Sequence, residues 1–506
     1  MSLIKCIDDY GIHSSNKMAH ISEDNSITYG DLKKYSDALA NYLLKNYGNE
    51  NTPILVYGHK ENEMLYSFIG IVKSGHSYVP IDSSLPVERV RDIIEVSQPH
   101  IIISIEEMPF ELENIKIINY NTLIEIFKTS EVESISEEYY VKKEDVYYSI
   151  FTSGSTGRPK GVQITLGCLE SFVKWGLSLC NDKEKVFMNQ APFSFDLSVM
   201  DTYLSLASGS TLYSINKKMI SNMKELFKSF ETSNITTWVS TPSFADMCLS
   251  DSNFNEKLLD KLDTMLFCGE TLTNSTVSKI RQAFPKVKIY NTYGPTESTV
   301  AITSIEVTDK VNEDFAPLPV GYSKENTWLY IMDENKNILP EGEKGEIIIV
   351  GDSVSIGYMN NEEINKKSFG TMEIDGKKYR MYKTGDKGYI KDNLLFYCGR
   401  LDFQVKLNGY RIELEDIENN IKNIDFIDNT IVLPHEKEGK IQYLIGVVTL
   451  TKRVEEKDFK IVSNIKNKLK EYIPEYMIPR KFIIKETLPM TPNGKVNRRA
   501  LMEEMK

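Results

Sequence analysis

Apolar and polar positions follow two alternating periods through the first 400 residues of the chain. Short strand-like runs occur at residues 146–151, 264–268 and 287–291, each bounded by polar or glycine-containing stretches. Between the last two runs, residues 274–284 carry apolar side chains at helical spacing. A strand, a helix and a second strand in this order predict a parallel βαβ unit with a right-handed crossover.

The predicted helix has one apolar face. Val277, Ile280 and Phe284 fall at positions i, i+3 and i+7, which lie on the same side of an α-helix. Asn274 is suited to the N-cap, and Pro285 is suited to end the helix. The N-terminal part of the chain is therefore expected to have an α/β fold.

The pattern changes near residue 400. Beyond it we expect a short strand at 404–407, a turn at 408–409, strands at 430–433 and 443–448, and two amphipathic helices. The apolar faces predicted for these helices are Leu414, Ile417, Ile421 and Ile424 for the first, and Phe459, Val462, Ile465 and Leu469 for the second. We therefore predict a large core domain over 1–400 and a small separate α+β domain over 401–506.

Residues 152–161 combine three features that bind phosphate groups. Glycines let backbone N–H groups approach an anion closely, hydroxyl groups add side-chain donors, and Lys160 adds a positive charge. The other residues concerned are Gly154, Gly157 and Gly161 with Thr152, Ser153, Ser155 and Thr156. Because Pro159 precedes the lysine and disfavours helix, the segment is expected to be a mobile loop and differs from a Walker A motif. By itself it is equally consistent with a polar turn.

Two further polar segments also follow predicted strands. Gly269 and Glu270 follow the strand at 264–268, and residues 292–297 follow the strand at 287–291. Ligands of parallel α/β sheets bind beyond the carboxyl ends of the strands. We therefore expect both segments and the 152–161 loop to lie on one sheet and to form one site.

Composition narrows the class of protein. The chain has 506 residues, 41% of them apolar and 26% charged, which is typical of a globular protein with more than one core. Its net charge of −12 argues against a general nucleic-acid binder. The six cysteines form no Cys-x-x-Cys pair, and neither a signal peptide nor a membrane-spanning run is recognisable. We expect a soluble cytoplasmic protein without membrane insertion.

Six motifs in order resemble the adenylate-forming superfamily, which includes nonribosomal peptide adenylation domains, acyl-CoA synthetases and luciferases. The motifs lie at residues 152–161, 291–297, 382–386, 399–402, 409–413 and 493–495. The resemblance covers nearly the whole chain. It implies a multi-layered N-terminal domain with parallel βαβ sheets and a small mobile C-terminal domain. It also implies an enzyme that joins a carboxylate to the α-phosphate of ATP and releases pyrophosphate.

The resemblance also implies roles for individual residues in binding ATP. Thr152, Ser153 and Lys160 would contact the phosphates, and Asp386 would accept hydrogen bonds from the ribose hydroxyls. Tyr293 would stack on adenine, and Glu297 would hold Mg²⁺. The rest of the nucleotide site would comprise Asn291, Thr292, Gly294, Pro295, Thr296, Tyr397, Cys398, Gly399 and Arg400. Without the resemblance, a surface cap or a salt bridge would be the favoured interpretation of each carboxylate.

Two residues of the C-terminal part would serve catalysis. Lys495 would bridge the substrate carboxylate and the α-phosphate, and so belongs to the catalytic, nucleotide and substrate sites. A flexible ammonium suits a transferring phosphoryl group. Asp402 matches the hinge about which the small domain turns between adenylation and thioester formation.

The acid to be activated is indicated by three residues. Asp196 matches the aspartate that pairs with the substrate ammonium in amino-acid-activating members, although it could instead cap a helix beginning at Leu197. Cys268 and Val300 match the small side-chain pocket of members that activate D-alanine for D-alanylation of lipoteichoic acid. Such members pass D-alanine to the phosphopantetheine thiol of a carrier protein, which would here be a separate chain supplied in trans. The present chain is expected to be a monomer. Adenylation of another small amino acid, acyl-CoA synthesis and nucleotide binding without catalysis stay open as alternatives.

Overall fold

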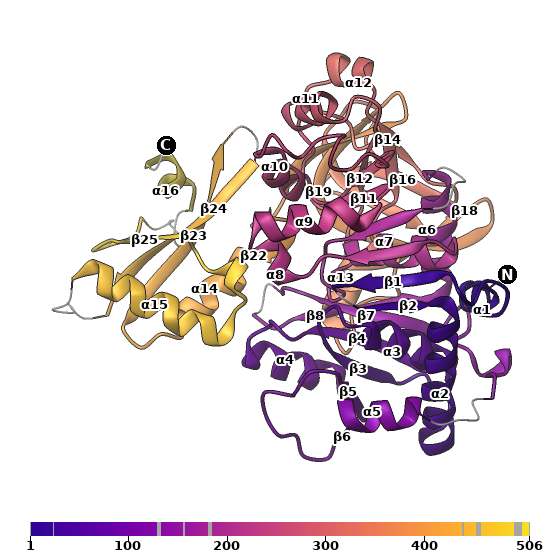
Figure 1. The fold of residues 1–506 in the computed structure, drawn as a ribbon. Coiled ribbons are helices and arrows are strands. Elements are labelled where there is room, and N and C mark those ends of the chain that lie inside the picture. Colours follow the sequence, from indigo (N-terminus) through magenta and orange to yellow (C-terminus); the bar gives the residue numbers. More distant parts are fainter. Residues whose placement is uncertain are drawn as a thin grey trace. The chain divides into compact units, whose positions relative to one another are not determined.

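The computed structural model describes residues 2–23, 25–128, 133–154, 157–180, 185–437, 440–451, 457–489 and 498–504. The chain divides into two compact units, whose elements are labelled in Figure 1. The first unit comprises residues 1–83, 97–151 and 161–401, and the second comprises 84–96, 152–160 and 402–506. The domain boundary expected between residues 400 and 401 stays a prediction.

A six-stranded sheet in the order β6-β5-β3-β4-β7-β8 contains the predicted strand at 146–151. Its strands are β3 (Pro53–Gly58), β4 (Ser77–Asp82), β5 (Ile101–Ser104), β6 (Lys116–Asn119), β7 (Val146–Thr152) and β8 (Lys160–Thr165). The pairings of β3 with β4 and β5, of β5 with β6 and of β4 with β7 are all parallel. The accompanying helices are α2 (Tyr29–Tyr47), α3 (Asn62–Lys73), α5 (Tyr120–Phe127) and the short 3₁₀ helix η1 (Glu137–Tyr139). The helix α4 (Val87–Ser97) belongs almost entirely to the second unit. β3, β4 and β5 are buried almost throughout, as expected for a parallel sheet.

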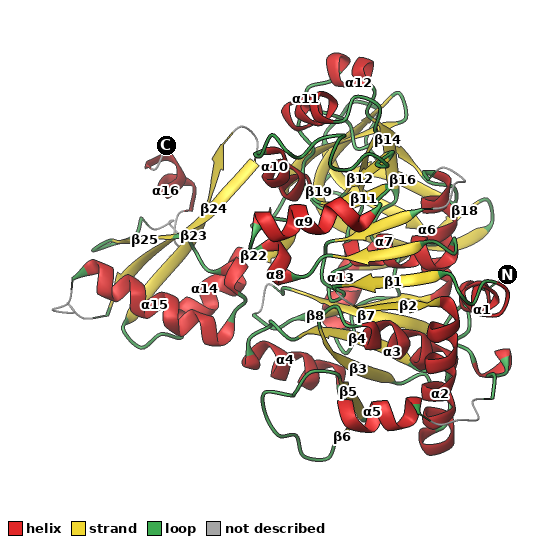
Figure 2. Cartoon of the chain, in the orientation of Figure 1, coloured by secondary structure: helices red, strands yellow, loops and turns green. Residues whose placement is uncertain are grey.

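A nine-stranded sheet contains the predicted βαβ unit, and its order is β15-β14-β13-β12-β11-β9-β10-β1-β2. The pairings from β13 through β1 are parallel, and antiparallel strands flank them on both sides. Its strands are β1 (Met18–Ser22), β2 (Asn25–Thr28), β9 (Val186–Asn189), β10 (Thr211–Ser214), β11 (Thr237–Ser240), β12 (Thr264–Phe267), β13 (Lys288–Tyr293), β14 (Thr303–Glu306) and β15 (Tyr322–Ser323). The helices in this part are α1 (Leu3–His13), α6 (Leu166–Ser178), α7 (Leu197–Ala207), α8 (Lys217–Ile220), α9 (Met223–Ser233), α10 (Pro242–Leu249), α11 (Asn274–Ala283) and α12 (Asp309–Asp314). Figure 2 shows these helices and strands by colour.

The parallel pairing of β12 with β13 confirms the βαβ prediction, and the predicted apolar face of α11 is buried. The predicted N-cap was one residue late, because the side chain of Thr273 accepts the hydrogen bond from the Thr276 N–H and caps the helix. The expectation of a single sheet was wrong. β7 belongs to the six-stranded sheet, whereas β12 and β13 belong to the nine-stranded sheet.

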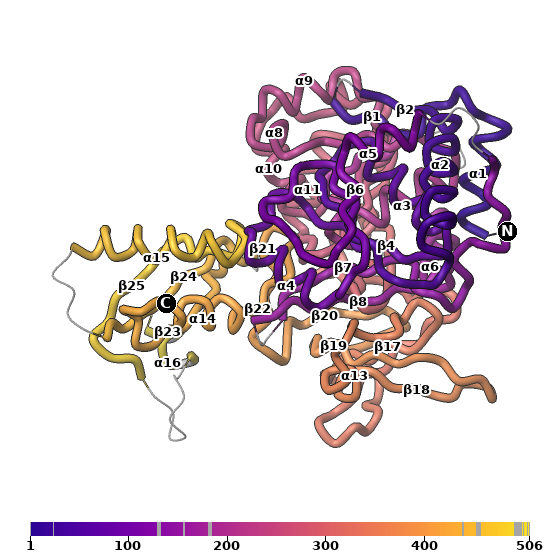
Figure 3. Tube along the Cα trace, turned by 90° about the horizontal axis from the view of Figure 1, so that it is seen from below, coloured from indigo at the N-terminus to yellow at the C-terminus, as the bar shows by residue number. Residues whose placement is uncertain are grey.

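A five-stranded antiparallel sheet completes the first unit, in the order β16-β17-β19-β18 with β20 also paired to β19. Its strands are β16 (Thr327–Met332), β17 (Gly345–Gly351), β18 (Phe369–Ile374), β19 (Lys377–Lys391) and β20 (Leu394–Arg400), with helix α13 (Glu362–Ser368) beside them. Figure 3 shows α13, β17, β18, β19 and β20 grouped together. The long strand β19 brings Asp386 to the candidate site.

The second unit has its own hydrophobic core and the expected α+β composition. Its C-terminal elements are the hairpin β21 (Gln404–Leu407) and β22 (Tyr410–Glu413), the strands β23 (Ile427–Lys437), β24 (Lys440–Leu450) and β25 (Lys481–Ile484), the helices α14 (Leu414–Lys422), α15 (Asp458–Tyr472) and α16 (Arg498–Glu504), and the 3₁₀ helix η3 (Glu475–Met477). The predicted face of α15 was partly wrong. Phe459 is 65% exposed, and Ile461 is buried together with Ile465 and Leu469.

None of the helices in the described part of the chain is both long and apolar enough to cross a membrane.

Candidate active site

The exit of β13 provides the framework of the candidate site. The Asn291 side chain donates to the Pro319 carbonyl and the Thr292 hydroxyl to the Phe267 carbonyl, each at 2.8 Å. Both side chains are buried and are used by the protein's own backbone. They therefore hold the strand end in place.

Tyr293 connects the end of β13 to Asp386 on β19. Its hydroxyl donates to Asp386 Oδ2 at 2.6 Å, and Arg400 Nη1 donates to Asp386 Oδ1 at 2.9 Å. Asp386 is buried. Each of its carboxylate oxygens therefore accepts a hydrogen bond from a protein donor. Burial and the charge of Asp386 raise the pKa of Tyr293 well above its ordinary range, so this phenol stays protonated and donates.

The other residues predicted on β20 lie close to this group. The Tyr397 ring lies 6.0 Å from the Tyr293 ring, centroid to centroid. Cys398 is exposed, and Gly399 has a φ of 99°, which favours glycine. The end of β20 therefore brings an aromatic face and a tight backbone bend beside Asp386.

Glu297 is completely buried in the short 3₁₀ helix η2 (Thr296–Ser298). The Tyr358 hydroxyl donates to Glu297 Oε1 at 2.6 Å and lies 3.3 Å from the Tyr382 hydroxyl. Within the described residues there is no cluster of three or more His, Cys, Asp or Glu side chains suited to a metal. A lone carboxylate fits an ion such as Mg²⁺, which takes most of its ligands from water and substrate phosphates. Sequence reasoning missed Tyr358, because no motif marks it.

Asp196 lies immediately before α7. The Thr296 hydroxyl donates to Asp196 Oδ2 at 2.6 Å. Asp196 occupies the N-cap position, but its side chain makes no capping hydrogen bond. The capping alternative is therefore wrong, and the carboxylate is directed to the segment that follows β13.

Cys268 and Val300 are both buried, and the Cys268 thiol donates to the Val300 carbonyl at 3.6 Å. Thr299 and Val300 have φ values of 61° and 67°, a region that β-branched residues strongly disfavour. A hydrogen bond from the Ala301 N–H to the Thr299 carbonyl closes this turn. A Cβ at Gly294 would lie 2.6 Å from Ala301 Cα, so the turn requires glycine opposite it. Such strain is typical of ligand sites.

The residues predicted to contact phosphates belong to the second unit. The Ser153 hydroxyl donates to the Arg411 carbonyl at 2.8 Å and accepts from the Glu413 N–H. Lys160 is the first residue of β8, is only 8% exposed and lies 3.7 Å from Glu413 Oε1. Thr152 Oγ1 is buried and makes no hydrogen bond within the described residues. Its orphaned hydroxyl fits a role in binding an absent ligand.

The remaining predicted residues divide between described and undescribed parts of the chain. Pro295 is half-buried next to η2. Asp402 begins the last segment of the second unit and accepts a hydrogen bond from the Gln404 N–H at 3.2 Å. Lys495, Ser155 and Thr156 lie outside the described residues.

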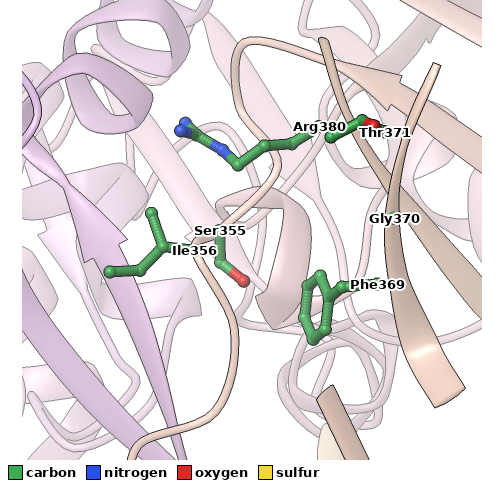
Figure 4. A pocket seen from close by; sticks show the side chains of 6 residues that line it. All are labelled: Ser355, Ile356, Phe369, Gly370, Thr371 and Arg380. Carbon is green, nitrogen blue, oxygen red and sulfur yellow. The ribbon is translucent and has the colours of Figure 1, made fainter. Parts of the chain in front are cut away.

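A cavity of about 310 Å³ is lined by none of the predicted residues. Figure 4 shows its lining residues Ser355, Ile356, Phe369, Gly370, Thr371 and Arg380. The Phe369 ring packs against the Tyr358 and Tyr382 rings at centroid distances of 5.4 and 4.9 Å. One lining residue, Ser355, donates its backbone N–H to the Glu297 carbonyl at 2.8 Å, so the wall of the cavity contacts the segment that carries Glu297.

Comparison with protein families and curated proteins gives full-length similarity. The family model described as "AMP-binding enzyme" matches residues 12–359, and the model described as "AMP-binding enzyme C-terminal domain" matches residues 416–495. The chain is 48% identical over 506 residues, all of both chains, to a protein named D-alanine–D-alanyl carrier protein ligase from Bacillus cereus (strain Q1). The protein of the same name from Bacillus thuringiensis (strain Al Hakam) is equally similar.

Solved structures show the same fold at low sequence identity. An artificially fused adenylation-PCP di-domain NRPS from Klebsiella oxytoca matches with a TM-score of 0.82 and 21% identity, covering 95% of this chain and 93% of that chain. A Vibrio cholerae adenylation domain, AlmE, in complex with glycyl-adenosine-5'-phosphate matches with a TM-score of 0.81 and 19% identity, covering 99% and 96%. These likenesses establish the adenylation-type fold, with a large N-terminal α/β part and a small C-terminal part.

Proposed function

Because the chain belongs to the family of AMP-binding enzymes, we propose that it is an AMP-forming D-alanine–carrier protein ligase. It activates D-alanine with ATP to D-alanyl adenylate and pyrophosphate. It then transfers the D-alanyl group to the phosphopantetheine thiol of a carrier protein supplied in trans, for D-alanylation of lipoteichoic acid. Full-length identity of 48% to ligases of this name supports the choice of substrate and acceptor.

One observation in the structure carries the choice of an amino acid over a fatty acid. The 2.6 Å hydrogen bond from Thr296 holds the Asp196 carboxylate against the segment that also contains Glu297. A partly buried carboxylate such as that of Asp196 is stabilised when a substrate cation pairs with it. The ammonium of an amino acid is such a cation, and a fatty acid has none.

The same site suits the nucleotide. Tyr293 and Arg400 fix Asp386, whose carboxylate would accept from the ribose hydroxyls, while Tyr293 would stack on adenine with Tyr397 beside it. Thr152, Ser153 and Lys160 would contact the phosphates. Glu297 would hold Mg²⁺, which screens the phosphate charge when bound. Cys268 and Val300 would enclose the alanine methyl group.

The reaction has two steps. A carboxylate oxygen of D-alanine attacks the α-phosphorus of ATP, and the bond to the β-phosphate oxygen breaks to release pyrophosphate. The thiol then loses its proton and attacks the carbonyl carbon, and AMP leaves. Lys495 would stabilise the charge that develops in the first step. Asp402 would be the hinge about which the small domain turns between the first and the second step. The chain would act as a monomer.

ATP–pyrophosphate exchange tests the proposal. Exchange should depend on D-alanine and be much weaker with L-alanine, glycine, D-serine or a fatty acid. A preference for another amino acid would replace the substrate, and a preference for the fatty acid would favour acyl-CoA synthesis. An absence of exchange with every acid would favour a nucleotide-binding protein without catalysis.

A further inference from the structure

A buried lysine outside the predicted site contacts the segment that carries Asp196. Lys60 is the second residue after β3 and is 2% exposed. Its ammonium donates to the backbone carbonyls of Ala191 at 2.7 Å, Asn189 at 3.1 Å and Gln190 at 3.3 Å, and also to the Asn189 side-chain oxygen. One cation thus connects the six-stranded sheet to the three residues at the end of β9.

The contacts of Asn189 extend this connection. Its side-chain oxygen also accepts from the Ser214 hydroxyl at 2.8 Å, and its amide donates to Asp201 Oδ1 at 2.8 Å. Ser214 ends β10, and Asp201 lies in α7. The end of β9 is therefore tied to the neighbouring strand and to the helix that Asp196 precedes.

Only a short connection separates these contacts from Asp196. Five residues follow Ala191 up to Asp196, and α7 begins at Leu197. Phe193 lies within this connection, and its buried ring is 5.4 Å from the Lys60 ammonium and 5.6 Å from the Phe68 ring. The connection is held at its start and at its middle, so it has little freedom to move Asp196.

Burial of the Lys60 ammonium is unfavourable unless its N–H donors make hydrogen bonds that the fold requires. Burial lowers the pKa of Lys60 to about 7, against the opposing charges of Asp201 and Asp82. An apolar residue would avoid this desolvation but would take one donor from each of the three carbonyls, of which those of Asn189 and Ala191 also accept from the Ile215 N–H and the Asn189 amide. The contacts, rather than packing, therefore account for a cation here.

We propose that Lys60 is a positioning residue of the amino-acid site, which fixes the Asn189–Ala191 backbone and thereby sets Asp196 where the substrate ammonium binds. The inference rests on the proposed function, because that function gives Asp196 its role. Lys60 itself touches neither substrate nor nucleotide in this assignment.

Steady-state ATP–pyrophosphate exchange by Lys60→Met tests the inference. Methionine retains the length and apolar stem but has no donor. The KM for the amino acid should rise by about tenfold or more, as expected when donors to a charged site are lost, while the KM for ATP should stay within about twofold. Lys60→Gln, which keeps an amide donor, should show a smaller rise in the same constant and serves if the methionine variant does not fold.

Lys185→Met is the matched control. Lys185 is also 2% exposed, but it precedes β9 at its other end and pairs with Asp263 at 2.9 Å. Its loss should lower stability without changing the KM for the amino acid. An equal rise in that constant for both variants, or none for Lys60→Met, would overturn the inference.

A double variant separates positioning from a general effect. If Lys60 acts through Asp196, adding Lys60→Met to Asp196→Asn should change the amino-acid KM by less than about twofold. Multiplicative effects would refute this coupling. The measurements use whichever amino acid the wild-type protein activates best, so a failure of D-alanine as substrate leaves the test of Lys60 intact. If the wild type activates only acids without an ammonium group, both proposals fail.

Discussion

Replacing Tyr358 by phenylalanine removes one hydroxyl from a fully buried carboxylate. The hydroxyl donates to Glu297 Oε1 at 2.6 Å, and Glu297 has no exposed surface. The ring itself can stay in place, because it packs against Phe369. The substitution therefore tests the hydrogen bond and not the packing.

The expected cost follows from the charge of the acceptor. A hydrogen bond to a charged group contributes about 1.5–3 kcal/mol, and a buried carboxylate that loses a donor keeps its desolvation cost. We expect the free energy of unfolding of the first unit to fall by this amount. The apparent affinity for Mg²⁺ in the exchange reaction should fall several-fold, because the carboxylate proposed to hold the ion is no longer fixed.

Urea unfolding monitored by tryptophan fluorescence reports on the first unit alone. The chain's three tryptophans are Trp175, Trp238 and Trp328, and all belong to that unit. Tyr382→Phe is the control, because its hydroxyl lies 3.3 Å from that of Tyr358 and should contribute about 1 kcal/mol or less. If Tyr358→Phe cost no more than the control and left the Mg²⁺ dependence unchanged, the proposed role of the buried carboxylate would be wrong.

Three further changes test the stability of the first unit and two other proposed site residues. Burial lowers the pKa of His20 from 6.5 to about 3, so between these two pH values the unfolded chain binds more protons than the folded chain. Relative to His20→Gln, the wild type should therefore lose on the order of 2 kcal/mol of stability between about pH 7 and pH 5. Parallel pH dependences of the two proteins in urea unfolding would contradict this. Cys268→Ala removes the thiol that contacts the Val300 carbonyl and should reduce the preference for D- over L-alanine by on the order of tenfold in exchange kinetics; an unchanged ratio would exclude the thiol from stereoselection. Lys495→Ala should abolish exchange while circular dichroism and the unfolding midpoint stay near wild type, and exchange near the normal rate would remove this lysine from the mechanism.

The spacing of apolar residues was sufficient to predict the buried face of a helix where the sequence offered only one apolar stripe. The face of α11 was predicted because Val277, Ile280 and Phe284 offered a single apolar stripe. In α15, Phe459 and Ile461 both fit a stripe with Ile465 and Leu469, and only packing within the second unit decides that Ile461 is buried. The sheet to which β7 belongs was likewise not predictable, because strand order depends on long-range pairing.

In the candidate site, too, some residues could be predicted from the sequence and others could not. Family motifs indicated Asp196, Glu297 and Asp386, but not the groups that orient them. Lys60 and Tyr358 looked like ordinary residues in the sequence, since a lone lysine after a strand is usually solvated. Their importance arises only from the carbonyls and the carboxylate that the fold places around them.

The left-handed turn at Thr299 and Val300 has a consequence for protein engineering. Broader substrate ranges are usually obtained at the expense of stability, because enlarging a pocket creates a void. At position 300, where the Val300 side chain is proposed to enclose the alanine methyl group, a glycine would remove that side chain and would also adopt the observed backbone angle without strain. Room for a larger acid and relief of the backbone would then arise from one substitution. At this turn, part of the cost of removing a buried side chain from the proposed alanine pocket would therefore be offset by relief of the backbone.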